Sequence, residues 1–239
     1  MSVIDGSPTV VIVDHGAGNL SSVRFACEAV GLRATISASA SALPSADAVI
    51  LPGVGAFGRA MAALEERGLV EPLRAFAAGG RPLWGICLGM QLLMEESEEF
   101  GRHRGLGLVP GRVVGFARRG DGSHPAKVPH IGWNRIVAPG SAPSAWAGTP
   151  LAGLPDGTCM YFVHSFCVKP AVSATTLSVT EYAGVRFCSS LQQGSIFGCQ
   201  FHPERSGRAG LAVYRRLASL LGVSGLDRED RRVVECAVR

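Results

Sequence analysis

The strongest chemical signal in the sequence is Cys87, at the centre of the pentapeptide Gly85-Ile-Cys-Leu-Gly89. A Gly-x-nucleophile-x-Gly pattern between an expected strand and an expected helix is typical of a nucleophile elbow, here with cysteine in place of serine. The glycines leave room for a sharp, strained turn. The start of a helix favours the thiolate form, and the Leu88 N–H would face an oxyanion beside the sulfur. The alternative is a buried cysteine in a glycine-rich turn.

A base for such a thiol is present far along the chain, in Phe201-His-Pro-Glu204. Pro203 favours an extended conformation for His202, and side chains two positions apart on an extended chain project to the same side. We therefore expect Glu204 to reach the His202 ring, fix its tautomer and stabilise its charged form. The alternative is a histidine at a strand end beside a solvated glutamate.

A third segment, Leu51-Pro-Gly-Val-Gly55, follows an expected strand and precedes an expected helix. This is where α/β sheets hold their ligands, and an N–H of the Gly53-Val54 peptide could supply a second oxyanion donor. A phosphate cradle is the rival interpretation, but the segment has neither GK[ST] nor GxGxxG. A plain turn is the other alternative.

The elements that must position these residues follow from hydrophobic periodicity. In the first hundred residues, short apolar runs alternate with helical spacing, which predicts a mostly parallel sheet covered on both faces. The expected strands there span 9–14, 32–37, 48–51 and 82–86, and one helix carries Gln91 to Met94. The second half is mainly strands, over 109–116, 131–137, 159–168, 175–180, 185–191 and 195–201, with a turn at 192–194 and a last helix over 206–221.

The fold class predicted is therefore α/β, with an open, mostly parallel mixed sheet flanked by helices. Because strands of both halves are expected in one sheet, residues 1–221 are predicted to form one domain. Residues 222–239 are expected to be a polar C-terminal tail without order.

The composition excludes several classes of protein. The 239 residues are 47% hydrophobic and 18% charged, which excludes a disordered chain. No apolar run approaches the roughly 18 residues needed to cross a bilayer, and the N-terminus has no signal-type stretch, so we expect a cytoplasmic protein without a membrane partner. The seven cysteines include no CxxC pair, which predicts no metal site. The cations are scattered rather than clustered, which argues against a nucleic-acid partner.

The motifs occur in the order of a known family. Gly85-Ile-Cys-Leu-Gly-Met-Gln-Leu-Leu93 and Gly198-Cys-Gln-Phe-His-Pro-Glu204 resemble the triad-type, class I glutamine amidotransferases, which implies a flavodoxin-like core. Three further segments look like the glutaminase subunits of imidazole glycerol phosphate synthase, an enzyme of histidine biosynthesis. They are Pro52-Gly-Val-Gly-Ala-Phe57, Val128-Pro-His-Ile-Gly-Trp-Asn134 and Tyr161-Phe-Val-His-Ser-Phe166.

The resemblance implies a role for each matching residue. Cys87 would be the nucleophile, His202 the base and Glu204 the orienting acid. The oxyanion donors would be Leu88 and the Gly53-Val54 peptide. The family implies no cofactor, and the residues expected to hold L-glutamine are Gln91, Glu99, Ser165, Phe166 and Gly55. For Gln91 and Glu99, a helix-surface amide and a solvated acidic run are the alternatives.

The resemblance also implies a partner, a cyclase subunit with a (β/α)₈ barrel that receives ammonia within a heterodimer. Trp133, Asn19 and Arg205 would face it. Two residues depart from the family pattern: Arg205 stands where lysine is common, and Phe166 where tyrosine is frequent. Three alternatives stay open, namely a stand-alone cysteine hydrolase, a non-catalytic binding subunit, and a related glutaminase that feeds another pathway.

Overall fold

The computed structural model describes residues 6–116, 127–140 and 146–224. Five of its strands are neighbours in one sheet and run parallel. In spatial order they are β2 (Arg33–Ser37), β1 (Thr9–Val13), β3 (Ala48–Gly53), β4 (Leu83–Cys87) and β13 (Ile196–Cys199). The short apolar runs of β1, β3, β4 and β13 are those expected of strands buried on both faces, whereas β2 lies at the edge of the sheet and is partly exposed.

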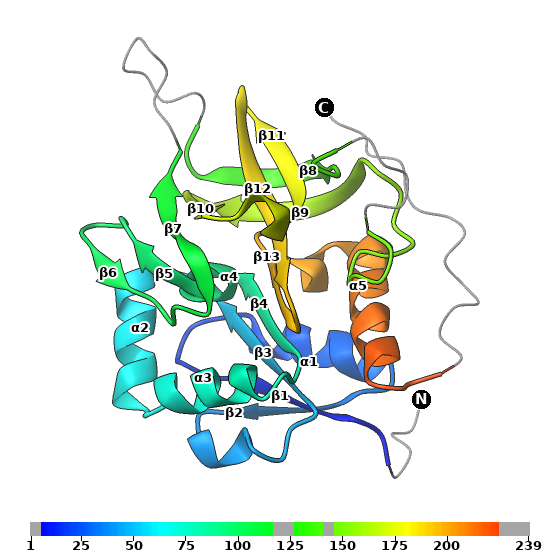
Figure 1. The fold of residues 1–239 in the computed structure, drawn as a ribbon. Coiled ribbons are helices and arrows are strands. Elements are labelled where there is room, and N and C mark those ends of the chain that lie inside the picture. The colour runs from blue at the N-terminus through cyan, green and yellow to red at the C-terminus, as the bar shows by residue number, and fades with distance from the viewer. Residues whose placement is uncertain (1–5, 117–126, 141–145, 225–239) are drawn as a thin grey trace.

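The same sheet continues past β13 with mostly antiparallel pairing. The added strands are β12 (Val185–Gln193), β11 (Thr176–Tyr182), β10 (Phe166–Pro170), β7 (Val109–Gly115), β5 (Met94–Ser97) and β6 (His103–Arg104). Within the described residues the order is β2-β1-β3-β4-β13-β12-β10-β7-β5-β6, with β11 paired to β12 (Figure 1). The open mixed sheet of the predicted fold class is confirmed.

Helices cover both faces of the parallel strands (Figure 1). On one side α1 (Leu20–Ala29) and α5 (Gly207–Leu220) share a buried cluster with β1, which includes Val10, Ile12, Val23, Cys27, Val213 and Leu217. On the other side α2 (Phe57–Glu66) and α3 (Val70–Ala78) pack against the alternate residues of β1, in a cluster with Val11, Val13, Phe57, Met61, Leu64, Leu73 and Phe76. The alternation along β1 divides the core between the two faces.

Three local predictions differ from the structure. The helix after Cys87, α4 (Leu88–Leu92), ends early, because Met94 already pairs with Val109 of β7 as the start of β5. The expected single strand over 159–168 is divided at Ser165 into β9 (Thr158–His164) and β10. Within the described ranges β9 pairs only with β8 (His130–Ile136), in a separate two-stranded sheet, so the expectation of one sheet is wrong there.

The predicted last helix over 206–221 agrees with α5, which ends at Leu220. Most of the predicted polar tail, residues 225–239, lies outside the described residues. The expected turn at 192–194 falls slightly later, at Gly194 and Ser195 between β12 and β13.

Candidate active site

Cys87 lies at the turn between β4 and α4, in a backbone conformation that L-residues rarely adopt (φ 55°, ψ −109°). A Cβ on Gly89 would lie 1.6 Å from the Leu51 carbonyl oxygen, and a Cβ on Gly85 would lie 2.7 Å from the Gly89 carbonyl carbon. No side chain fits at either position, so the steric reason predicted for the two glycines is confirmed. Such backbone strain persists where the surrounding structure enforces it, often at functional sites.

His202 and Glu204 form a buried, hydrogen-bonded pair. Nδ1 of His202 lies 2.8 Å from Oε1 of Glu204, and the two side chains are 5% and 2% exposed. Because an ionised carboxylate can only accept, Nδ1 carries a proton and Nε2 is left for a reacting group. The predicted contact is present, but only His202 is extended; Pro203–Arg205 forms a 3-10 turn (η3), with Pro203 at its first position.

Cys87 lies close enough to His202 to affect the pKa of the imidazole. Burial disfavours the charged imidazole, but Cys87 and the Glu204 carboxylate outweigh burial and raise the pKa of His202 to about 10. Nε2 of His202 is buried and, among the described residues, makes no hydrogen bond to a group other than Cys87. The arrangement favours a protonated imidazole, with a proton held beside the Cys87 sulfur.

The strand register explains why three distant segments converge. β3, β4 and β13 are adjacent and parallel, with Gly53 opposite Cys87 and Cys199 opposite Ile86. The chain therefore leaves the sheet at neighbouring points before Val54, at Cys87 and before His202. The carboxyl ends of parallel strands are the usual place for a ligand in an α/β sheet.

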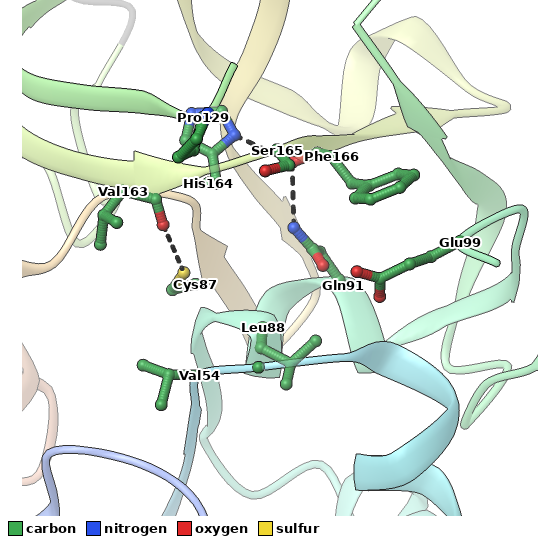
Figure 2. Close-up of a pocket in the computed structure, with 11 residues that line it drawn as sticks. Val54, Cys87, Leu88, Gln91, Glu99, Pro129, Val163, His164, Ser165 and Phe166 are labelled. Atoms are coloured by element: carbon green, nitrogen blue, oxygen red, sulfur yellow. Dashed lines mark hydrogen bonds between the residues drawn. The ribbon is translucent and has the colours of Figure 1, made fainter.

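A cavity of about 260 Å³ opens beside Cys87. Figure 2 shows side chains from separate segments of the chain turned toward it. Of the predicted oxyanion residues, Leu88 and Val54 line the cavity. Gly53 does not line it, because Gly53 packs against the side chains of Leu88 and His15. The predicted glutamine contacts all line it, and they are Gly55, Gln91, Glu99, Ser165 and Phe166.

Glu99 also has a structural contact. Its Oε2 accepts a hydrogen bond of 2.6 Å from the Phe57 N–H, at the first position of α2. A carboxylate at this place satisfies a free N–H of the helix and interacts favourably with the helix dipole. Glu99 is 8% exposed, so it is buried and is not part of a solvated acidic surface.

Several polar residues in contact with the site were given no role by the sequence reasoning. Gln200 is fully buried and donates from Nε2 to the Cys87 sulfur at 3.5 Å, while the thiol donates to the Val163 carbonyl at 3.7 Å. His164 lines the cavity, and buried His15 donates from Nε2 to the Pro52 carbonyl at 2.8 Å. Gln200 and His164 lie inside the family motifs, which was the available signal, and His15 begins the glycine-rich turn over residues 15–19 that contains Asn19.

The residues predicted to face a partner are exposed. Trp133 on β8 is 52% exposed and meets the Tyr161 ring edge-on, with ring centroids 6.0 Å apart. The Arg205 guanidinium lies 4.7 Å from the centroid of the same Tyr161 ring. Trp133, Tyr161 and Arg205 thus form one surface cluster, whereas Asn19 is exposed at the start of α1.

Two features of the described residues bear on other functions. In the described ranges no group of three or more histidine, cysteine or acidic side chains is arranged to hold a metal ion. No helix among those residues combines the length and the apolar character needed to cross a membrane.

A family model described as "Glutamine amidotransferase class-I" matches residues 11–216. The chain belongs to this family. The matched range contains Cys87, His202 and Glu204 and every element from α1 to β13. The fold is shared with solved structures of lower identity: "Structure of PurLQS from Thermotoga maritima" has a TM-score of 0.69 at 18% identity, covering 90% of this chain and 99% of that one. A chain titled "Crystal structure of glutamine amidotransferase" has a TM-score of 0.67 at 18% identity.

Three relatives with higher identity share the name of one enzyme subunit. "Imidazole glycerol phosphate synthase subunit HisH" of Chlorobium luteolum is 43% identical over 209 residues, which is 87% of this chain and 98% of that protein. The subunit of the same name from Moorella thermoacetica is 43% identical over 218 residues, which is 90% of this chain and 97% of that protein. "Subunit HisH 1" of Legionella pneumophila is 39% identical over 212 residues, with 89% and 99% covered.

Proposed function

We propose that this chain is the glutaminase subunit of an imidazole glycerol phosphate synthase. It hydrolyses the side-chain amide of L-glutamine to glutamate and ammonia. The observation that carries the proposal is the grouping of a strained cysteine, a buried His–Glu pair and a cavity lined by Gln91 and Glu99. Similarity to the HisH subunits over most of the chain supports the choice of pathway.

In the first half of the reaction, the Cys87 thiolate attacks the amide carbon of glutamine. The N–H of Leu88 and an N–H of the Gly53-Val54 peptide stabilise the oxyanion that forms. The His202 imidazolium gives its proton to the amide nitrogen, the C–N bond breaks, and ammonia leaves. A thioester between Cys87 and the glutamyl group remains.

In the second half, neutral His202 accepts a proton from water, and the hydroxide formed attacks the thioester carbon. The C–S bond breaks, which returns the thiolate and releases glutamate. Glu204 stabilises the imidazolium in both halves through the contact with Nδ1. Gln91, Glu99 and the backbone at Ser165 and Phe166 hold the α-amino and carboxylate ends of glutamine.

The ammonia passes to a cyclase subunit, a (β/α)₈ barrel, in a heterodimer. Ammonia released into water at neutral pH is mostly protonated and is then no nucleophile, so a direct transfer is needed. The cyclase combines it with a ribotide and forms imidazole glycerol phosphate and aminoimidazole carboxamide ribotide. We assign the contact with the cyclase to Trp133, Arg205 and Asn19, and the working compartment to the cytoplasm, where a catalytic thiol stays reduced.

The test is glutamate release from glutamine by the purified chain, alone and with the cognate cyclase and its ribotide ligand. We expect a low rate alone, a rise of about tenfold or more in the loaded complex, and no activity for Cys87→Ala. Full activity without a partner would favour the stand-alone hydrolase. A non-catalytic binding subunit would be favoured by two results together. The unaltered chain would form no glutamate, and Cys87→Ala would still form the complex and stimulate the cyclase.

A further inference from the structure

Two buried histidines on the β8–β9 sheet form a hydrogen-bonded pair that the reaction scheme does not use. His130 and His164 lie opposite each other in the strand register, with Nδ1 of His130 3.0 Å from Nε2 of His164. Nδ1 of His164 lies 2.9 Å from the carbonyl oxygen of Phe166. A carbonyl can only accept, so Nδ1 of His164 carries its proton and Nε2 accepts from His130. The tautomers of both rings are therefore fixed.

The surroundings keep this pair neutral and in place. Burial lowers the pKa of His164 to about 3 and that of His130 to about 4, so both rings are uncharged at neutral pH. The His130 ring is stacked on Tyr182 and Phe162, at centroid distances of 4.0 and 5.0 Å. Its Nε2 faces the Asn134 side-chain amide at 3.4 Å, and that amide also donates to the Glu181 carbonyl.

The Phe166 carbonyl connects the histidines to the nucleophile. Nε2 of Gln91 donates to this carbonyl at 3.0 Å and to Oε1 of Gln200 at 3.0 Å. Nε2 of Gln200 then donates to the Cys87 sulfur at 3.5 Å. Figure 2 shows the nitrogen of Gln91 turned toward Phe166. We call this continuous chain of hydrogen bonds the polar relay; it contains Asn134, His130, His164, the Phe166 carbonyl, Gln91 and Gln200.

We propose that His130, His164 and Gln200 are positioning residues of the proposed glutaminase. His164 fixes the direction of the Phe166 carbonyl, and the carbonyl fixes the amide of Gln91 so that its oxygen is left for the substrate. Gln200 holds the other side of that amide and also aligns the Cys87 sulfur. None of the three has to touch glutamine, since each acts through Gln91 or Cys87. The kinetic part of this inference rests on the proposed function.

The two amide variants of His164 separate its two hydrogen bonds. In His164→Asn the amide nitrogen is as many bonds from Cα as Nδ1, so the donor to the Phe166 carbonyl is kept. In His164→Gln the nitrogen takes the place of Nε2, and that donor is lost. In the cyclase complex we expect His164→Asn to stay within about threefold of the unaltered kcat/KM, and His164→Gln to fall about tenfold with a higher KM for glutamine.

The control is Thr180→Val, which removes a buried hydrogen bond of 2.9 Å to the Arg135 carbonyl next to the relay but outside it. We expect it to lower the melting temperature and leave kcat/KM unchanged. The proposal would be overturned if His164→Asn and His164→Gln lost equal amounts of kcat/KM, and if these losses, together with that of Thr180→Val, simply followed the fall in melting temperature. Activity of His164→Gln equal to that of the unaltered chain would also overturn it.

A second measurement does not depend on glutamine turnover. Gln200→Met keeps the length of the side chain and removes both of its hydrogen bonds, so we expect iodoacetamide to alkylate Cys87 about fivefold more slowly. Cys87→Ala gives the background from other cysteines. An unchanged alkylation rate contradicts the role of Gln200. If the unaltered complex released no glutamate while Gln200→Met still slowed alkylation, the proposed function would fail and the relay would stand.

Discussion

Two groups of residues meet at the cavity, and they come from differently built parts of the molecule. The strand-end cluster, formed by Cys87, His202 and Glu204 with the Val54 loop, follows neighbouring parallel strands. The polar relay comes mainly from the antiparallel β8–β9 sheet and the bend at Ser165. The first group depends on backbone geometry that glycines permit, and the second on hydrogen bonds between side chains from different strands. Substitutions should therefore damage them in different ways.

The largest loss of stability is expected at the backbone of the strand-end cluster. In Gly89→Ala the new Cβ would meet the Leu51 carbonyl oxygen at 1.6 Å, so the β4–α4 turn must move. We expect a loss of more than about 3 kcal/mol in the free energy of unfolding, measured with urea. Gly140→Ala is the control, because Gly140, like Gly89, does not have a positive φ but has open space around it. Similar losses in both variants would mean that the close approach does not explain the glycine.

The next effect is catalytic. Glu204→Gln keeps the shape of the side chain but removes the charge that helps to raise the pKa of His202. The neutral amide stabilises the imidazolium poorly, so kcat for glutamine should fall by roughly 10²–10⁴-fold, while the thermal unfolding temperature changes little. Steady-state kinetics in the cyclase complex measure this. A loss below about threefold would remove Glu204 from the mechanism.

Much of the strand-end cluster could be predicted from sequence because its causes are local. Gly85 and Gly89 flank Cys87 within five residues, and Pro203 lies between His202 and Glu204, so short motifs encode the turn at Cys87 and the His202–Glu204 contact. The parallel strands were predictable for the same reason, since apolar runs and glycine-rich turns alternate along the chain.

The relay could not be predicted in this way. His130 on β8 forms a hydrogen bond with His164 on β9, and Gln200 forms one with Gln91, which lies 109 positions earlier in the chain. These contacts depend on strand register and on the bend at Ser165, which the sequence pattern did not reveal. The bend itself was missed because apolar residues resume directly after His164 and Ser165.

The two groups should also differ in their response to acid. The pKa of His164 is lowered to about 3 by burial, so below pH about 6.5 the unfolded chain binds a proton that the folded chain does not. The stability contributed by the neutral ring is complete above that pH and falls as the pH drops toward 3, by up to ~1.4 kcal/mol per pH unit. His164→Asn should flatten the acid side of the stability curve. Parallel curves for the variant and the unaltered chain would contradict this.

The smallest effect concerns strain at the nucleophile. Cys87 has φ 55° and ψ −109°, which glycine tolerates and alanine does not. Cys87→Gly should therefore be more stable than Cys87→Ala by about 1 kcal/mol, although both lack the thiol. Urea unfolding of the two inactive variants gives the difference. A more stable alanine variant would mean that the elbow relaxes when the thiol is absent.

The central claim is that Cys87 forms a covalent bond to the side-chain carbon of glutamine. The most direct measurement is mass mapping after the cyclase complex reacts with an electrophilic analogue of glutamine. We expect one adduct per chain, located on Cys87, suppressed by excess glutamine and formed much more slowly in Glu204→Gln. An adduct on another cysteine, or none on Cys87 in a complex that releases glutamate, would contradict it.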